Sequence, residues 1–148
     1  LVYRNILVLA HTSIVIPGVL LLFGEPVDWH LLLILPAIVV IAINGVWISI
    51  FFGMAGARFR DVGPIVGSFM QVIFFVTPIF WSPGALGPYA WVAVLNPLFA
   101  AVDIVRSPLL GVAPSPYSWS IVLLSTLLGC VLTFILFARF RSRIAFWV

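Results

Sequence analysis

The chain has no lysine, a single cysteine and very few charged side chains. Its basic residues are seven arginines, and charged residues make up 7% of the 148, against roughly 25% in an ordinary soluble domain. Without lysine there is no P-loop, whose lysine contacts the nucleotide phosphates, so any ATP hydrolysis must belong to another chain. Cys130 alone allows no internal disulfide and no metal-ligand spacing. Hydrophobic residues make up 64%, which argues against a soluble protein.

Four uncharged apolar segments are long enough to cross a bilayer, which takes about 20 helical residues. They cover approximately residues 6–23, 31–52, 62–81 and 119–138. The sequence therefore predicts an all-α integral membrane protein, with residues 1–148 forming a single transmembrane domain.

The arginines predict the orientation of these spans, because short cytoplasmic loops carry an excess of basic residues. Six of the seven lie in alternate loops or at the ends: Arg4, Arg58, Arg60, Arg139, Arg141 and Arg143. Both ends are therefore expected to face the cytoplasm, in a multi-pass protein of a bacterial cytoplasmic (inner) membrane. These clusters account for the net charge of +3, and no basic patch with interleaved aromatic residues points to nucleic acid.

The segment between the last two spans, residues 82–118, holds six of the eleven prolines. It contains two apolar stretches that are too short to cross, Tyr89–Leu95 and Leu98–Leu110, with prolines around them. These stretches predict a pair of short external re-entrant helices, and a proline-rich surface loop is the alternative. Asp103 and Arg106 are three residues apart and are expected to pair on one helix face.

The third span has one polar face. At about 100° per residue, Ser68, Gln71 and Phe75 fall on the side that also carries two prolines, and Phe69 and Ile73 lie opposite. An amide near mid-depth is costly unless something satisfies it. This face is therefore predicted to line a transport path, and a buried interface between spans is the alternative.

Small residues recur every fourth position in the second and fourth spans. The two ridges are Gly45, Ser49, Gly53 and Ser125, Gly129, Thr133. Such ridges favour close helix packing over ligand binding. For Asn44 an interhelical hydrogen bond is favoured over a substrate contact.

Four separated motifs carry a family resemblance. They are YRNILVLAHT near the start, RFRDVGPIVGSFMQVIFFVTPIFW from Arg58, LNPLFAAVDIVRSPLLG from Leu95 and ARFRSRIAFWV at the end. In this order they resemble the permease subunit of ABC-2 transporters that export lipid-linked polysaccharides such as O-antigen, capsule or teichoic acid. The sequence departs at His11-Thr12, where family members often have His-Asn.

The resemblance implies a six-span permease fold, of which this chain is the later part, with an amphipathic helix and two spans before it. It implies two permease copies working with two ATPase subunits, ATP and magnesium on those subunits, no cofactor in this chain, and a lipid-linked glycan as substrate in contact with membrane lipid. Arg58, Arg60 and Asp61 would contact the ATPase, and the alternative is that they anchor the span at lipid headgroups.

Two other functions stay open. One is an ABC-2 permease for a drug or another lipophilic small molecule. The other is a membrane-embedded glycosyl or lipid-phosphate transferase, which needs carboxylates or a metal near the headgroup. The external acidic residues are only Glu25, Asp28 and Asp103, and no nucleophile, base and orienting group can be assigned from their spacing. A transporter subunit without enzymatic activity of its own is therefore the favoured interpretation.

Overall fold

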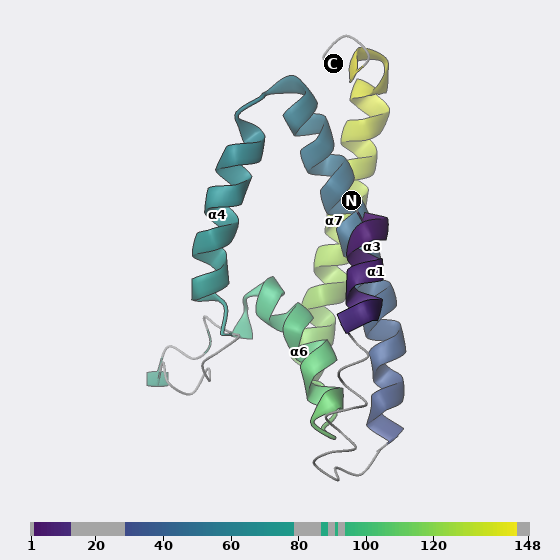
Figure 1. Cartoon of the computed structure of the whole chain (residues 1–148), viewed down its shortest axis with the longest axis vertical. Coiled ribbons are helices and arrows are strands. Elements are labelled where there is room, and N and C mark those ends of the chain that lie inside the picture. Colours follow the sequence, from purple (N-terminus) through teal and green to yellow (C-terminus); the bar gives the residue numbers. More distant parts are fainter. Residues whose placement is uncertain (1, 13–28, 79–86, 89–90, 92–93, 145–148) are drawn as a thin grey trace.

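The computed structural model describes residues 2–12, 29–78, 87–88, 91 and 94–144, and every regular element within these ranges is helical (Figure 1). The elements are α1 (Val2–Thr12), the short 3₁₀ helix η1 (Trp29–Leu33), α3 (Ile34–Arg58), α4 (Val62–Val76), α6 (Pro97–Leu109) and α7 (Pro116–Ile144). The all-α prediction agrees with this architecture.

Two of these helices are long and apolar enough to cross a membrane. They are the continuous segment Trp29–Arg58 and the segment Pro116–Ser142, which run side by side (Figure 1). They contain the predicted spans 31–52 and 119–138. Each is longer than predicted, because the helix continues past the apolar run into the turns that carry the arginines. The 30 residues of the first extend about 45 Å, more than the roughly 30 Å hydrocarbon core.

The third predicted span, 62–81, is shorter as a helix. α4 has 15 residues and ends at Val76, because a residue before proline is disfavoured in the α region. Thr77 precedes Pro78 and adopts φ −79°, ψ 127°, which is extended. Pro64 lies in the first turn of α4, where its missing N–H leaves no intrahelical bond unmade. Residues 79–81 are outside the described ranges.

Of the first predicted span, 6–23, only residues 6–12 are described, and they lie in α1. Residues 13–23 are outside the described ranges. Of the two predicted external helices, the second corresponds to α6. The first, Tyr89–Leu95, falls largely outside the described residues.

α6 has clear start and stop signals. The side chain of Asn96 accepts a hydrogen bond from the backbone N–H of Leu98 (2.9 Å), as an N-cap does, and Pro97 follows at the first helical position. After the helix, Gly111 has φ +71°, a left-handed conformation that costs glycine little.

The small core joins α3, α6 and α7. Ala37, Ala100, Ile104 and Val122 are its buried members. α6 lies against α7 and α3 toward the end of the molecule opposite the α3–α4 turn (Figure 1). α4 contributes no buried residue and diverges from the α3/α7 pair below that turn (Figure 1).

Candidate functional site

The interface between α3 and α7 is held by a polar network around Asn44. Its Nδ2 donates to Thr126 Oγ1 on α7 (2.5 Å) and to the carbonyl of Val40 (2.9 Å). Its Oδ1 accepts from Trp47 Nε1 (2.9 Å). The amide is thus satisfied on both sides, and the predicted interhelical hydrogen bond of Asn44 is present in the structure.

The small-residue ridge of α7 lets the indole of Trp47 approach the helix backbone. A methyl group at Gly129 would lie 2.5 Å from Trp47 Cζ2 and 2.6 Å from its Cδ2, far inside the usual 3.5–4.0 Å contact distance of carbon atoms. Gly129 is therefore a packing residue, as its ridge predicts. A methyl group at Gly53 on α3 would have no such neighbour within 4 Å, so no contact among the described residues explains this glycine of the α3 ridge.

The turn between α3 and α4 presents Arg58, Arg60 and Asp61, all exposed. Arg58 is the last residue of α3, and its guanidinium carbon lies 5.2 Å from the centre of the Phe59 ring, within the range of a cation–π contact. Asp61 precedes α4, and its side chain makes no capping hydrogen bond. The charges of this turn therefore face outward, where a partner or lipid headgroups can reach them.

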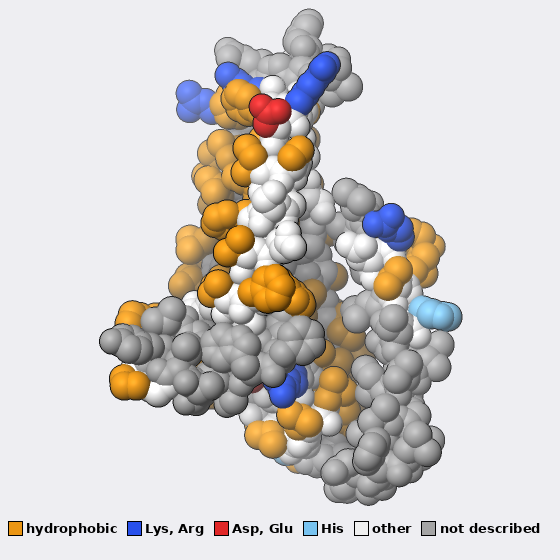
Figure 2. Space-filling model, turned by 60° about the vertical axis from the view of Figure 1, so that its left-hand side comes forward, with side chains coloured by type: hydrophobic (Ala, Val, Ile, Leu, Met, Phe, Trp, Pro, Cys, Tyr) orange, Lys and Arg blue, Asp and Glu red, His pale blue; other side chains and the backbone are white. Residues whose placement is uncertain are grey.

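The same end of the molecule carries the basic residues of α7. Arg139 and Arg141 are exposed on its last described turns, and Figure 1 places this end of α7 beside the α3–α4 turn. Figure 2 shows blue basic side chains gathered around one acidic side chain at this end. We call Arg58, Arg60, Arg139 and Arg141 the arginine-rich end.

The predicted ion pair between Asp103 and Arg106 is not formed in the described part of the chain. The Asp103 carboxylate instead accepts hydrogen bonds from Ser107 Oγ (2.8 Å) and Ser118 Oγ (2.6 Å), while Arg106 is exposed. Ser107 lies about one helical turn after Asp103 on α6, so its hydroxyl can contact the carboxylate. Ser118 contacts the same carboxylate from the first turn of α7. Asp103 therefore ties α6 to α7, and neither bond involves Arg106.

The predicted path residues lie on α4, a helix that is exposed over most of its surface. Ser68, Gln71 and Phe75 are all exposed, and Phe75 retains 70% of its accessible surface. Ser68 Oγ donates to the carbonyl of Pro64 (3.1 Å), whereas Gln71 makes no hydrogen bond with any residue that the structure describes. Of the opposite face, Ile73 is half-buried but Phe69 is also exposed. In Figure 2 hydrophobic side chains cover much of the visible surface of α4.

The far end of α4 is tied to α6. Thr77 is buried, and its hydroxyl donates to the carbonyl of Ile73 (2.8 Å) and accepts from Asn96 Nδ2 (3.1 Å). The same Asn96 caps α6. One side chain therefore fixes the spacing between the end of α4 and the start of α6.

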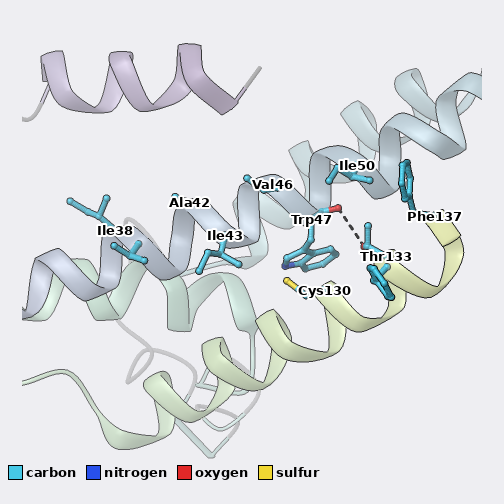
Figure 3. A pocket seen from close by; sticks show the side chains of 11 residues that line it. Ile38, Ala42, Ile43, Val46, Trp47, Ile50, Cys130, Thr133 and Phe137 are labelled. Atoms are coloured by element: carbon cyan, nitrogen blue, oxygen red, sulfur yellow. Dashed lines mark hydrogen bonds between the residues drawn. The ribbon is translucent and has the colours of Figure 1, made fainter. Parts of the chain in front are cut away.

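Hollows lined entirely by described residues lie along α3, α6 and α7. The first, about 620 Å³, runs along α3 and α7, where Trp47 points toward Cys130 and Thr133 across an apolar groove (Figure 3). The second, about 570 Å³, lies between α3, α6 and α7 and reaches Asn44 and Ser125. The third, about 240 Å³, is at the arginine-rich end and includes Arg58. Among the described residues no three His, Cys, Asp or Glu side chains gather into a metal-binding group.

Sequence reasoning missed the partners of two polar side chains. Ser107 could have been found, because it lies four residues from Asp103 on a helix face. Ser118 and the Asn96–Thr77 contact carried no such signal, since each joins residues of different elements, separated by 15 and 19 positions.

A family model described as ABC-2 type transporter matches residues 2–110, which include α1, η1, α3, α4 and α6. No curated protein and no solved structure matches the chain.

Proposed function

The chain belongs to the ABC-2 type transporter family, and from this premise we propose that it is the permease of an exporter for lipid-linked polysaccharides. A separate ATPase subunit supplies the energy, and the permease works as a pair of copies in the bacterial cytoplasmic membrane. Family membership makes the chain the membrane component of an ABC transporter. The motifs quoted above favour a glycan over a drug as the substrate.

The observation that carries the proposal is the open polar side of α4. A transport path through a membrane needs groups that can contact a polar cargo. Gln71 offers both an amide donor and an acceptor and is exposed near the middle of a helix otherwise rich in apolar residues. Phe75 lies one turn further and is exposed as well, so its ring face can stack on a sugar. A small lipophilic drug would need neither group.

We propose that the charged α3–α4 turn couples the permease to its ATPase subunit. Arg60 and Asp61 are exposed at the start of α4, so a partner that contacts the turn would act directly on the helix that carries the path. We assign ATP and its magnesium to that partner. We place the arginine-rich end in the cytoplasm, because the positive-inside rule favours this orientation.

The path is tested by the water access of single cysteines. In a Cys130→Ser background, we expect Ser68→Cys, Gln71→Cys and Phe75→Cys to react with a membrane-impermeant thiol reagent in at least one nucleotide state of the complex. Ile73→Cys on the half-buried face is the control and should stay protected. Equal protection of all four positions in every nucleotide state would make the polar side of α4 a packing interface.

The substrate class needs its own measurement. We expect ATP-dependent movement of a lipid-linked glycan across vesicles that hold the permease and its ATPase, detected when the glycan becomes accessible to an impermeant oxidant. Transport of a lipophilic dye with no movement of the glycan would favour the drug permease. Glycan transfer by the permease alone, without ATP, would favour the transferase.

A further inference from the structure

The hollow at the arginine-rich end combines an apolar wall with one cation. Phe51 and Ala55 of α3 and Leu136 and Phe140 of α7 line it, and Arg58 completes the lining on the side of the α3–α4 turn. The larger groove between α3 and α7 has no charged residue in its lining. This hollow can therefore hold both ends of an amphiphile, the apolar chain against its wall and the anionic headgroup at Arg58.

The guanidinium of Arg58 lies beside an aromatic ring at the edge of the hollow. The Arg58 carbon Cζ lies 5.2 Å from the centre of the Phe59 ring, and Phe59 also lines the hollow. The aromatic face favours this placement of the cation. A charge beside an apolar hollow is suited to an anionic headgroup whose chain enters the hollow.

The length and volume of the hollow limit the kind of ligand that it can bind. From Phe51 to Arg58 the α3 axis rises about 10 Å, a distance over which an amphiphile can have its headgroup at Arg58 and its chain beside Phe51. Its volume of about 240 Å³ is below the ~300–1,000 Å³ of typical ligand pockets. A hollow of this size suits one end of a hydrocarbon chain better than a bulky glycan.

The net positive charge of the arginine-rich end also favours an anionic ligand. Four exposed arginines and only one carboxylate, Asp61, lie at this end of the described chain, and basic residues near a membrane surface attract anionic lipids. No residue of α4 lines the hollow, so a ligand there lies apart from the proposed path. We propose that this hollow is a binding site for an anionic phospholipid of the adjoining leaflet, which stays bound and is not transported.

The test compares lipids retained by the intact transporter complex. The complex is equilibrated in vesicles of phosphatidylcholine mixed with phosphatidylglycerol, extracted in mild detergent, and its bound lipids are counted by native mass spectrometry. We expect Arg58→Gln to lower the ratio of bound phosphatidylglycerol to phosphatidylcholine about fivefold, the effect of one arginine near an anionic surface. Arg60→Gln is the matched control, because it removes the same charge from the same turn without lining the hollow, and it should lower the ratio clearly less than Arg58→Gln does.

A second variant tests the apolar part of the site. Ala55→Leu keeps every charge and fills the hollow, and we expect it to reduce retained lipid of both kinds. An equal fall in the ratio for Arg58→Gln and Arg60→Gln, or full retention by Ala55→Leu, would overturn the site. Displacement of phosphatidylglycerol by a phosphorylated polyprenol would also overturn it, because the hollow would then hold a carrier lipid. None of these outcomes depends on whether the complex exports a glycan.

Discussion

The contact of Trp47 on α3 with the backbone of α7 at Gly129 leads to a testable prediction. Replacing it with alanine places a methyl group against the indole of Trp47, 2.5 Å from Cζ2 and 2.6 Å from Cδ2. Trp47 cannot turn away freely, because its Nε1 donates to Asn44 Oδ1 at 2.9 Å. Packing of this kind is a main source of helix association in membranes, where lipid tails remove most of the hydrophobic drive between helices.

The magnitude follows from three opposing terms. Overpacking of a tight site costs about 1–3 kcal/mol, and losing the Trp47–Asn44 hydrogen bond costs about another 1 kcal/mol. Alanine regains about 1 kcal/mol over glycine in a helix interior. We therefore expect Gly129→Ala to lower the free energy of unfolding by about 1–3 kcal/mol. The measurement is titration of the detergent-solubilised protein with sodium dodecyl sulfate, followed by circular dichroism.

Gly53→Ala is the matched control, because Gly53 lies in α3 with no atom within 4 Å of the added methyl group. It should leave stability unchanged or raise it by up to about 1 kcal/mol. Trp47→Leu removes the clash, so Gly129→Ala should cost little in that background. If Gly129→Ala destabilises equally with tryptophan or leucine at position 47, the close approach does not explain the glycine.

Two further predictions concern charged residues at opposite ends of the molecule. Asp103→Ala should destabilise the protein by about 1–3 kcal/mol, because it leaves the buried Ser118 hydroxyl without its acceptor. Arg106→Ala should change stability by less than about 0.5 kcal/mol. The same titration checks both variants, and equal losses of stability would favour an ion pair between Asp103 and Arg106. At the α3–α4 turn, reversing the charges of Arg60 and Asp61 together should leave membrane insertion intact but uncouple ATP hydrolysis from transport, and unchanged transport per ATP hydrolysed in vesicles would refute the coupling role.

Much of the helical architecture was predictable because hydropathy is a local property. The runs at 31–52 and 119–138 lack charges for long enough to mark α3 and α7 without any knowledge of contacts. Their ends were placed too early, because helix propensity carries the backbone past the apolar run to Arg58 and Ile144. The early end of α4 was also readable in principle, since Pro78 restricts the residue before it.

The side-chain partners were less predictable. Asp103 offered two candidates within one turn of its own helix, Arg106 and Ser107, and the charge made the arginine the obvious choice. The structure favours the serines because Ser118 reaches the same carboxylate from α7. Contacts of this type depend on how two helices dock, which the order of residues along one helix does not specify.

The double role of Asn96 has a mechanical consequence. α4 is a helix about 22 Å long. A tight turn joins it to α3 at one end, and the Thr77–Asn96 hydrogen bond connects its other end to α6. Rigid secondary elements can carry coupling between distant sites, so we expect a displacement of the turn to reach Asn96, the N-cap of α6, at the opposite end. The same amide also caps α6, and pulling it away would loosen the start of that helix. We therefore expect the end of α4 and the start of α6 to move together, because both are hydrogen-bonded to Asn96.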